Sequence, residues 1–253
     1  MNRVLKCLTL VAVLAILGIN YSKAQGDFSF HAGLVSPLAS FADSRASNGQ
    51  IAWMEKTGRA GAGLGFEAGM KFRYGIPSIQ GLGVIVTADL FYNGPNTDVK
   101  DFWQDEVDEM LDYSDVEDVN LTLPKYVNLP IMIGVNYNHQ LSNSVKVYGE
   151  GALGLNIGML TNYRAQVIGD NFEDITGVNY ETNTSFAFQI GVGVLFSDRF
   201  SLGVHYYALG NQKIKGKYSE EEIYDGESDV DEDMLNLRSI NPTMFVVKAG
   251  FHF

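Results

Sequence analysis

Carboxylates are the side chains in this sequence with the clearest capacity for chemistry, and they gather in two stretches. Residues 98–118 hold ten acidic residues against one lysine, and residues 220–233 hold nine acidic residues and no basic one. In the second stretch the acids alternate along the chain, at Asp225, Glu227, Asp229, Asp231 and Asp233. Oxygen-rich clusters of this kind suit Ca²⁺. The pattern predicts either a weak calcium site or a solvated anionic surface that repels other anions.

The alternating acids do not form an EF-hand. An EF-hand loop that began at Asp229 would need glycine and glutamate where the sequence has Met234 and Ile240. We therefore expect any calcium site here to be looser than an EF-hand.

A second set of ionisable residues is spread along the chain at positions that alternate with apolar ones. It consists of Glu67, Lys71, Arg73, Asp89, Lys146, Glu150 and Lys248, together with His31, His205 and His252. On β-strands these residues would share one face. Opposite charges there would pair, because an unpaired buried charge is costly. The set predicts an interior network of salt bridges, with a proton or ion path and a histidine metal site as alternatives.

Composition excludes several classes of protein. Cys7 is the only cysteine, which excludes a disulfide scaffold, a thiolate zinc site and an iron–sulfur cluster. A formal net charge of -12, from 18 basic and 30 acidic residues, is unsuited to binding nucleic acid. A Ser/His/acid triad facing lipid would need a histidine on the apolar face, but the alternating pattern directs His31, His205 and His252 inward, and we expect His139 in a short turn. We therefore expect no enzymatic activity and no cofactor other than the candidate calcium ion.

Strands must position these residues, because the chain alternates with a period of two. Residues 60–74 show the pattern most clearly: even positions are apolar, while odd positions carry glycine and every charged residue. The pattern returns in residues 28–34, 82–92, 127–137, 145–157, 186–196, 200–208 and 245–253. Eight such segments predict a closed antiparallel barrel of the kind found in bacterial outer membranes.

The connections between the segments alternate in length. Residues 75–80, 138–144 and 197–199 are short, while 36–58, 93–122, 160–183 and 211–240 are long. Membrane barrels have short periplasmic turns and long external loops. In a soluble β-sandwich, the alternative fold, nothing favours a regular alternation of short and long connections. Aromatic residues beside the short turns and chain ends predict an interfacial girdle: Phe28, Phe30, Phe72, Tyr74, Tyr137, Phe196, Phe200, Phe251 and Phe253.

The first 24 residues have the features of a signal peptide. Arg3 and Lys6 precede an apolar run over residues 8–19, and Ser22-Lys23-Ala24 resembles a cleavage site. The run is too short to span a bilayer as a helix. We expect export of a mature chain with fifteen basic and thirty acidic residues.

One long connection contains a helical pattern. Trp103, Val107, Met110 and Leu111 fall at i, i+4, i+7 and i+8, which predicts a short amphipathic helix. Its apolar stripe would pack on its own loop or the barrel rim, or alternatively dock a partner.

Three segments resemble a known family. Residues 125–134, KYVNLPIMIG, resemble the Y-x-x-[IL]-P-[IL]-x-[IL] strand of the PorT-like outer-membrane β-barrel family of Bacteroidetes-type bacteria. Residues 147–154, VYGEGALG, resemble its next strand, and residues 188–194 with 202–210 resemble its closing hairpin, although Leu209-Gly210 reverse the family's order. The resemblance implies the barrel fold over residues 26–253, and a few members assist a secretion system. Pro130 lacks an N–H for the ladder, so we expect a bulge or kink there.

Together these patterns predict an eight-stranded outer-membrane β-barrel over residues 25–253, with both chain ends in the periplasm. We expect a monomer surrounded by outer-membrane lipid and inserted by the barrel assembly machinery, which recognises a terminal aromatic such as Phe253. The acidic loops would contact an external protein or glycan, giving a non-enzymatic structural or interaction role. A narrow transport or secretion-accessory barrel is the alternative, and a barrel-embedded enzyme is the third.

Overall fold

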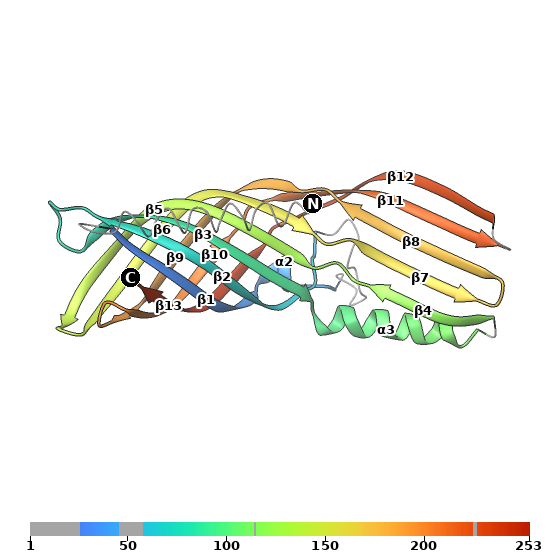
Figure 1. Cartoon of the computed structure of the whole chain (residues 1–253), viewed down its shortest axis with the longest axis horizontal. Coiled ribbons are helices and arrows are strands. Elements are labelled where there is room, and N and C mark those ends of the chain that lie inside the picture. The colour runs from blue at the N-terminus through green and yellow to red at the C-terminus, as the bar shows by residue number, and fades with distance from the viewer. Residues whose placement is uncertain (1–25, 46–57, 114, 225–226) are drawn as a thin grey trace.

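The computed structural model describes residues 26–45, 58–113, 115–224 and 227–253, and it contains a closed barrel (Figure 1). Eight antiparallel strands form it, in the order β1, β13, β10, β9, β6, β5, β3 and β2. Their bounds are β1 Gly26–Pro37, β2 Ala62–Gly75, β3 Leu82–Pro95, β5 Tyr126–Ser142, β6 Val145–Leu160, β9 Asn183–Phe196, β10 Phe200–Ala208 and β13 Thr243–His252. The predicted eight-stranded antiparallel barrel is confirmed.

The signal peptide predicted at residues 1–24 lies outside the described residues. Within the described residues, no helix has the length and apolar character needed to cross a membrane.

The barrel closes where its first strand meets its last. Residues 29–37 of β1 pair with β13, and residues 26–35 of the same strand pair with β2. Each barrel strand therefore has a hydrogen-bonded neighbour on both sides, and the ladder has no open edge.

Side chains alternate between the two surfaces of the barrel. Val86 on β3 is 44% exposed, whereas the next residue, Thr87, is 1% exposed. The exposed outer set includes Leu34, Phe66, Val86, Ile133, Leu153, Ile190, Val204 and Val247. The buried inner set includes Glu67, Thr87, Asp89, Asn136, Glu150, Gln189, His205 and Lys248. The distribution is the inverse of that in a soluble protein, with apolar residues outside and polar residues inside.

The predicted outward direction of Ala60 and Ala62 is wrong. Both are buried in the apolar core. The structure gives the reason: β2 begins only at Ala62, and its pairing with β3 shifts register between Ala62 and Gly65. Regular alternation therefore starts after this shift.

Of the bulge or kink predicted at Pro130, the bulge is absent. β5 keeps a single register with β6 across this residue. Pairing with β3 is interrupted at Leu129 and Pro130 but resumes in the same register. The lack of an N–H on Pro130 therefore interrupts one of the two strand pairings, and only locally.

The described parts of the long connections lie together at one end of the barrel, and most of these residues form regular structure. Five strands form a second antiparallel sheet, in the order β12, β11, β8, β7 and β4. Their bounds are β4 Val116–Thr122, β7 Tyr163–Gly169, β8 Phe172–Tyr180, β11 Gln212–Tyr224 and β12 Glu227–Ile240. They continue barrel strands beyond the rim, and the helix α3 (Thr97–Leu111) lies beside β4 (Figure 1). We call these five strands the distal sheet.

Aromatic rings mark both ends of the apolar surface. At the short-turn end, Phe30 contacts Phe28 and Phe253, with ring centroids 4.9 and 6.0 Å apart, and Phe251 contacts Phe200 at 5.2 Å. The sequence predicted this group. A second group lies toward the distal sheet, where Phe66 stacks on Tyr92 at 5.0 Å and Tyr206 contacts Phe188 and Phe245.

Val86→Arg tests which surface faces lipid. A cation on the outer surface near the middle of a bilayer should lower the free energy of unfolding from vesicles by about 2–4 kcal/mol. Val86→Leu, which keeps the position apolar, should leave it almost unchanged. Denaturant titration of vesicle-inserted protein measures both, and a Val86→Arg variant as stable as Val86→Leu would show that the surfaces are misassigned.

Candidate functional site

The interior of the barrel is closed at the distal-sheet end by an apolar plug. The short helix α2 (Ala39–Ala42) brings Phe41, which is fully buried, to within 5.2 Å of the Tyr126 ring, measured between centroids. The Tyr126 hydroxyl donates a 2.5 Å hydrogen bond to the carbonyl of Ala60. The plug consists of these residues and the interior residues that pack in the same cluster, among them Val35, Leu160, Ala187, Leu209, Met244 and Val246.

An ion cluster, formed by side chains from five strands, lies next to the plug. His31 Nε2 is 2.6 Å from Asp89 Oδ1 and 2.9 Å from Glu67 Oε1. Lys248 Nζ is 3.7 Å from the same Asp89 oxygen and 3.9 Å from the same Glu67 oxygen, and it donates a hydrogen bond to the Tyr207 hydroxyl. Both carboxylate side chains are fully buried. The Lys248 ammonium, together with His31 when it is protonated, thus faces two carboxylates and offsets part of the cost of burying them.

A second ion cluster is centred on Glu150. Lys71 Nζ lies 2.8 Å from Glu150 Oε2, and His205 Nδ1 lies 3.5 Å from Glu150 Oε1. The side-chain amides of Asn136 and Gln189 each donate to this carboxylate over 3.4 Å. The carboxylate therefore accepts hydrogen bonds from three other strands, and His205 approaches it from a fourth.

Little free space remains between these groups. Nearer the distal sheet, Asn128 Oδ1 accepts hydrogen bonds from Asn156 and Gln212, at 2.9 and 2.7 Å. Beside Lys71 and Tyr148, toward the short turns, an interior space of about 10 Å³ remains, which is roughly what one water needs. Side chains from strands on different sides of the described barrel therefore meet in its interior.

Two residues of the predicted network lie at its short-turn end. Arg73 Nε donates to Asn136 Oδ1 at 2.9 Å, and its Nη2 donates to the Gly81 carbonyl. Lys146 pairs with Asp198, a residue of the β9–β10 turn, at 2.6 Å. Arg73 thus joins the Glu150 cluster through Asn136, whereas Lys146 is part of the rim.

A metal centre was one alternative for the interior histidines. Among the described residues, a single group of three places its ligand atoms within 4.8 Å of one another: His31, Glu67 and Asp89. His205 belongs to the second cluster instead, and His252 lies at the short-turn mouth. Because the Lys248 ammonium already supplies positive charge to the same two carboxylates, we interpret the group as an ion cluster.

At the short-turn mouth the structure brings together a serine, a histidine and an aspartate that sequence reasoning missed. His252 Nδ1 lies 3.3 Å from Asp27 Oδ2, and its Nε2 lies 3.0 Å from Ser201 Oγ. This is the order of atoms in a hydrolytic triad. Ser201, however, sits in a strand paired on both sides, so its backbone offers no cradle of free N–H donors for an oxyanion. We interpret the three residues as a hydrogen-bonded clamp between β1, β10 and β13.

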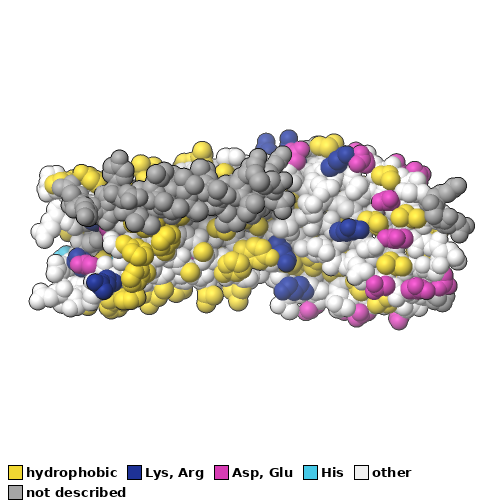
Figure 2. Space-filling model, in the orientation of Figure 1, with side chains coloured by type: hydrophobic (Ala, Val, Ile, Leu, Met, Phe, Trp, Pro, Cys, Tyr) yellow, Lys and Arg dark blue, Asp and Glu magenta, His cyan; other side chains and the backbone are white. Residues whose placement is uncertain are grey.

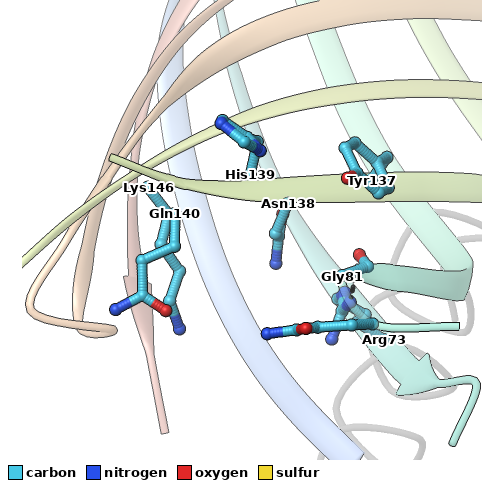
Figure 3. Close-up of a pocket in the computed structure, with 8 residues that line it drawn as sticks. Arg73, Gly81, Tyr137, Asn138, His139, Gln140 and Lys146 are labelled. Carbon is cyan, nitrogen blue, oxygen red and sulfur yellow. Dashed lines mark hydrogen bonds between the residues drawn. The ribbon is translucent and has the colours of Figure 1, made fainter. Parts of the chain in front are cut away.

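A polar cleft of about 520 Å³ opens at the same end of the barrel (Figure 3). Its lining residues are Arg73, Gln80, Gly81, Tyr137, Asn138, His139, Gln140 and Lys146. Asn138 and Gln140 point to one side of β5, with Arg73 facing them across the cleft, while Tyr137 and His139 point to the other side (Figure 3). The cations here already have partners, Asn136 and Asp198, so the cleft is a polar vestibule below the filled interior.

The predicted calcium residues lie on the distal sheet. Asp229, Asp231 and Asp233 follow one face of β12, and the first two stand opposite Glu222 and Glu220 of β11. All three are exposed. Asp225 and the side chain of Glu227 lie outside the described residues. The strand pairing thus gathers five described carboxylates on one face of a hairpin.

The predicted amphipathic helix is α3, and much of its apolar stripe faces its own sheet. Trp103 contacts the Tyr163 ring of β7 at 5.8 Å, and Val107 and Met110 are half-buried, whereas Leu111 is exposed. Asn96 caps the helix by accepting a hydrogen bond from the Val99 N–H. Packing on its own loop therefore accounts for most of the stripe.

An exposed ion pair joins this helix to the segment that follows α2. Arg45 Nε donates a 3.0 Å hydrogen bond to Asp98 Oδ2, in the first turn of α3. That hydrogen bond, with the attraction of the charges, holds the pKa of the Asp98 carboxyl below its ordinary value.

No protein-family model matches this chain, and no curated protein matches it in sequence. Solved structures with a similar fold include the outer membrane protein OprG from Pseudomonas aeruginosa, at 15% identity and a TM-score of 0.41 over 90% of this chain and 96% of that one. A major outer membrane protein from Thermus thermophilus gives 10% identity and a TM-score of 0.47 over 90% and 99% of the two chains. Neisserial surface protein A has 12% sequence identity and a TM-score of 0.38, over 90% of this chain and 96% of that one. These likenesses are too distant to assign a function.

Lys71→Met tests the interior ion clusters. It would leave Glu150, whose side chain is 1% exposed, without its nearest cation. We expect a loss of about 3–5 kcal/mol in the free energy of unfolding. The double variant Lys71→Met/Glu150→Gln should recover much of that loss, because it also removes the stranded charge.

Lys146→Met is the matched control, since Lys146 is half-buried at the rim and its partner Asp198 is exposed. Such a pair is worth about 0–1 kcal/mol. Equal losses for Lys71→Met and Lys146→Met would contradict the buried network.

Proposed function

We propose that this protein is a non-enzymatic barrel of the outer membrane, with short turns and both chain ends in the periplasm and the distal sheet outside the cell. The observation that carries this proposal is the inverted distribution of side chains: exposed apolar residues outside, paired ions and amides inside. Hydrocarbon favours this surface, and a closed ladder is required within it. Membership of the PorT-like family, and insertion by the barrel assembly machinery, are parts of the same proposal.

We propose further that the barrel does not conduct. The apolar plug closes one end, and the two ion clusters fill the lumen behind it. An eight-stranded barrel is just wide enough for its side chains to fill the interior. A transport or secretion-accessory role through the lumen would require this packing to open.

Single-channel recording in planar bilayers tests the closed lumen. The purified barrel should show no steady open state in moderate salt, whereas a porin in the same bilayer should conduct. A reproducible open level that scales with salt concentration would favour the transport alternative.

The role that fits a closed barrel is contact through its distal sheet. The sheet and α3 carry most of the acidic residues, and ordered strands present them as a fixed surface. An external protein or glycan is the partner we propose, with lipid around the monomeric barrel. The acidic surface argues against nucleic acid.

Calcium is expected to bind weakly to the acidic face of the β11–β12 hairpin. Exposed carboxylates repel one another by about 1 kcal/mol at 4 Å in water, and a divalent ion relieves this more than monovalent salt does. Protease added to intact cells should therefore cut residues 220–233 more slowly in millimolar calcium than in sodium of equal ionic strength. Calorimetry should give a dissociation constant on the order of 10⁻⁴–10⁻³ M.

Replacing Asp229, Asp231 and Asp233 by asparagine should abolish the protection, while Asp101→Asn on α3 should not. Equal protection by the two salts would leave a solvated anionic surface. Cleavage within residues 138–144 in intact cells would reverse the proposed orientation.

A further inference from the structure

Five basic residues lie just beyond the apolar surface of the barrel, at the distal-sheet end, on segments adjoining β5, β6 and β10. Lys125 precedes β5, Arg164 lies at the start of β7, and Lys213, Lys215 and Lys217 follow one another on β11. All five are exposed. We call them the basic belt. In an acidic chain with 18 basic residues, this local excess of positive charge needs a physical reason.

The belt points outward. On β11 the three lysines alternate with Gln212, Ile214 and Gly216, which are all buried on the inner side. Lys125 Nζ lies 5.8 Å from the centroid of the Tyr92 ring, in the second aromatic group. The belt therefore begins where the apolar surface ends, and its side chains are directed away from the barrel axis.

The sign of the outward charges changes along the strands. On β11 the lysines are followed by outward-facing Glu221, and Glu173 and Glu232 face outward on the neighbouring strands. Lys217 pairs with Glu232 at 2.6 Å at the boundary between the two zones. Figure 2 shows the same order on one face of the molecule: apolar side chains over the barrel, then basic ones, then acidic ones.

The belt has few partners within the protein. Among the described residues, Lys217 is the one member in an ion pair, so Lys125, Arg164, Lys213 and Lys215 have their charges available. A cation beside an aromatic ring at the end of an apolar band is at the depth of lipid headgroups. Without these cations, the acidic distal sheet would stand directly over any anionic leaflet.

We propose that the basic belt binds the phosphate groups of lipid headgroups in the outer leaflet. This inference rests on the proposed membrane location and orientation. Lysine and arginine are the natural donors to phosphate oxygens, and each cation near an anionic lipid surface contributes about a fivefold gain in affinity. The belt gives the barrel a preferred depth, because its cations favour the phosphates while the acids beyond them are repelled.

The test uses nanodiscs that contain the full mature barrel and either a lipid A-type lipid bearing phosphate or its dephosphorylated counterpart. Native mass spectrometry measures which lipid stays bound. The wild-type barrel should retain the phosphorylated lipid preferentially. Lys213→Gln/Lys215→Gln should reduce that preference by about fivefold for each cation removed.

Lys100→Gln/Lys146→Gln is the control, because it removes the same charge from α3 and from the short-turn rim. This control should keep the wild-type preference. An equal reduction of the lipid preference in both double variants, or no preference for the phosphorylated lipid in the wild-type protein, would contradict the proposal that the basic belt binds phosphate groups. Heat-modifiable migration in gels reports insertion separately, and a wild-type barrel that failed to insert would overturn the proposed membrane location instead.

Discussion

The pairing of β1 with β13 is the interaction on which the rest of the structure depends. It joins residues 29–37 to the last strand and turns an open sheet into a barrel. Without it, two edges would carry unpaired N–H and C=O groups, each costing several kcal/mol in hydrocarbon. With it, the outer surface can consist of apolar side chains alone. Closure also creates an enclosed interior, and that interior must be filled.

The interior is filled by two different kinds of packing. Toward the distal sheet, Phe41 and its neighbours pack as an ordinary apolar core. Toward the short turns, the carboxylates of Glu67, Asp89 and Glu150 face Lys71 and Lys248. A charge without a partner there would be costly, so the positions of these five residues depend on one another. Through these contacts, β2 is joined to β6 and β13 to β3 across the interior.

Much of the barrel follows from sequence because alternation with a period of two is imposed by the strand itself. Val86 and Thr87 show how directly it assigns the two surfaces. Sequence failed where packing between distant segments decides the outcome. Phe41 enters the lumen from a connection expected to be external, and Asp27 meets Ser201 and His252 only because β1, β10 and β13 are neighbours. The distal sheet was not predicted because polar residues lie on both of its faces. Its strands therefore lack the alternation of apolar with polar residues that marks the barrel strands.

The inverted surface is the central claim, and contacts between protein methyl groups and lipid test it most directly. In isotope-labelled barrel in bilayer nanodiscs, nuclear Overhauser effects from lipid acyl-chain protons should reach the methyl groups of Ile133 and Val204. They should be absent at Ile85 and Met132, which the structure buries inside the barrel. Acyl-chain contacts at Ile85 and Met132, with none at Ile133 and Val204, would contradict the account.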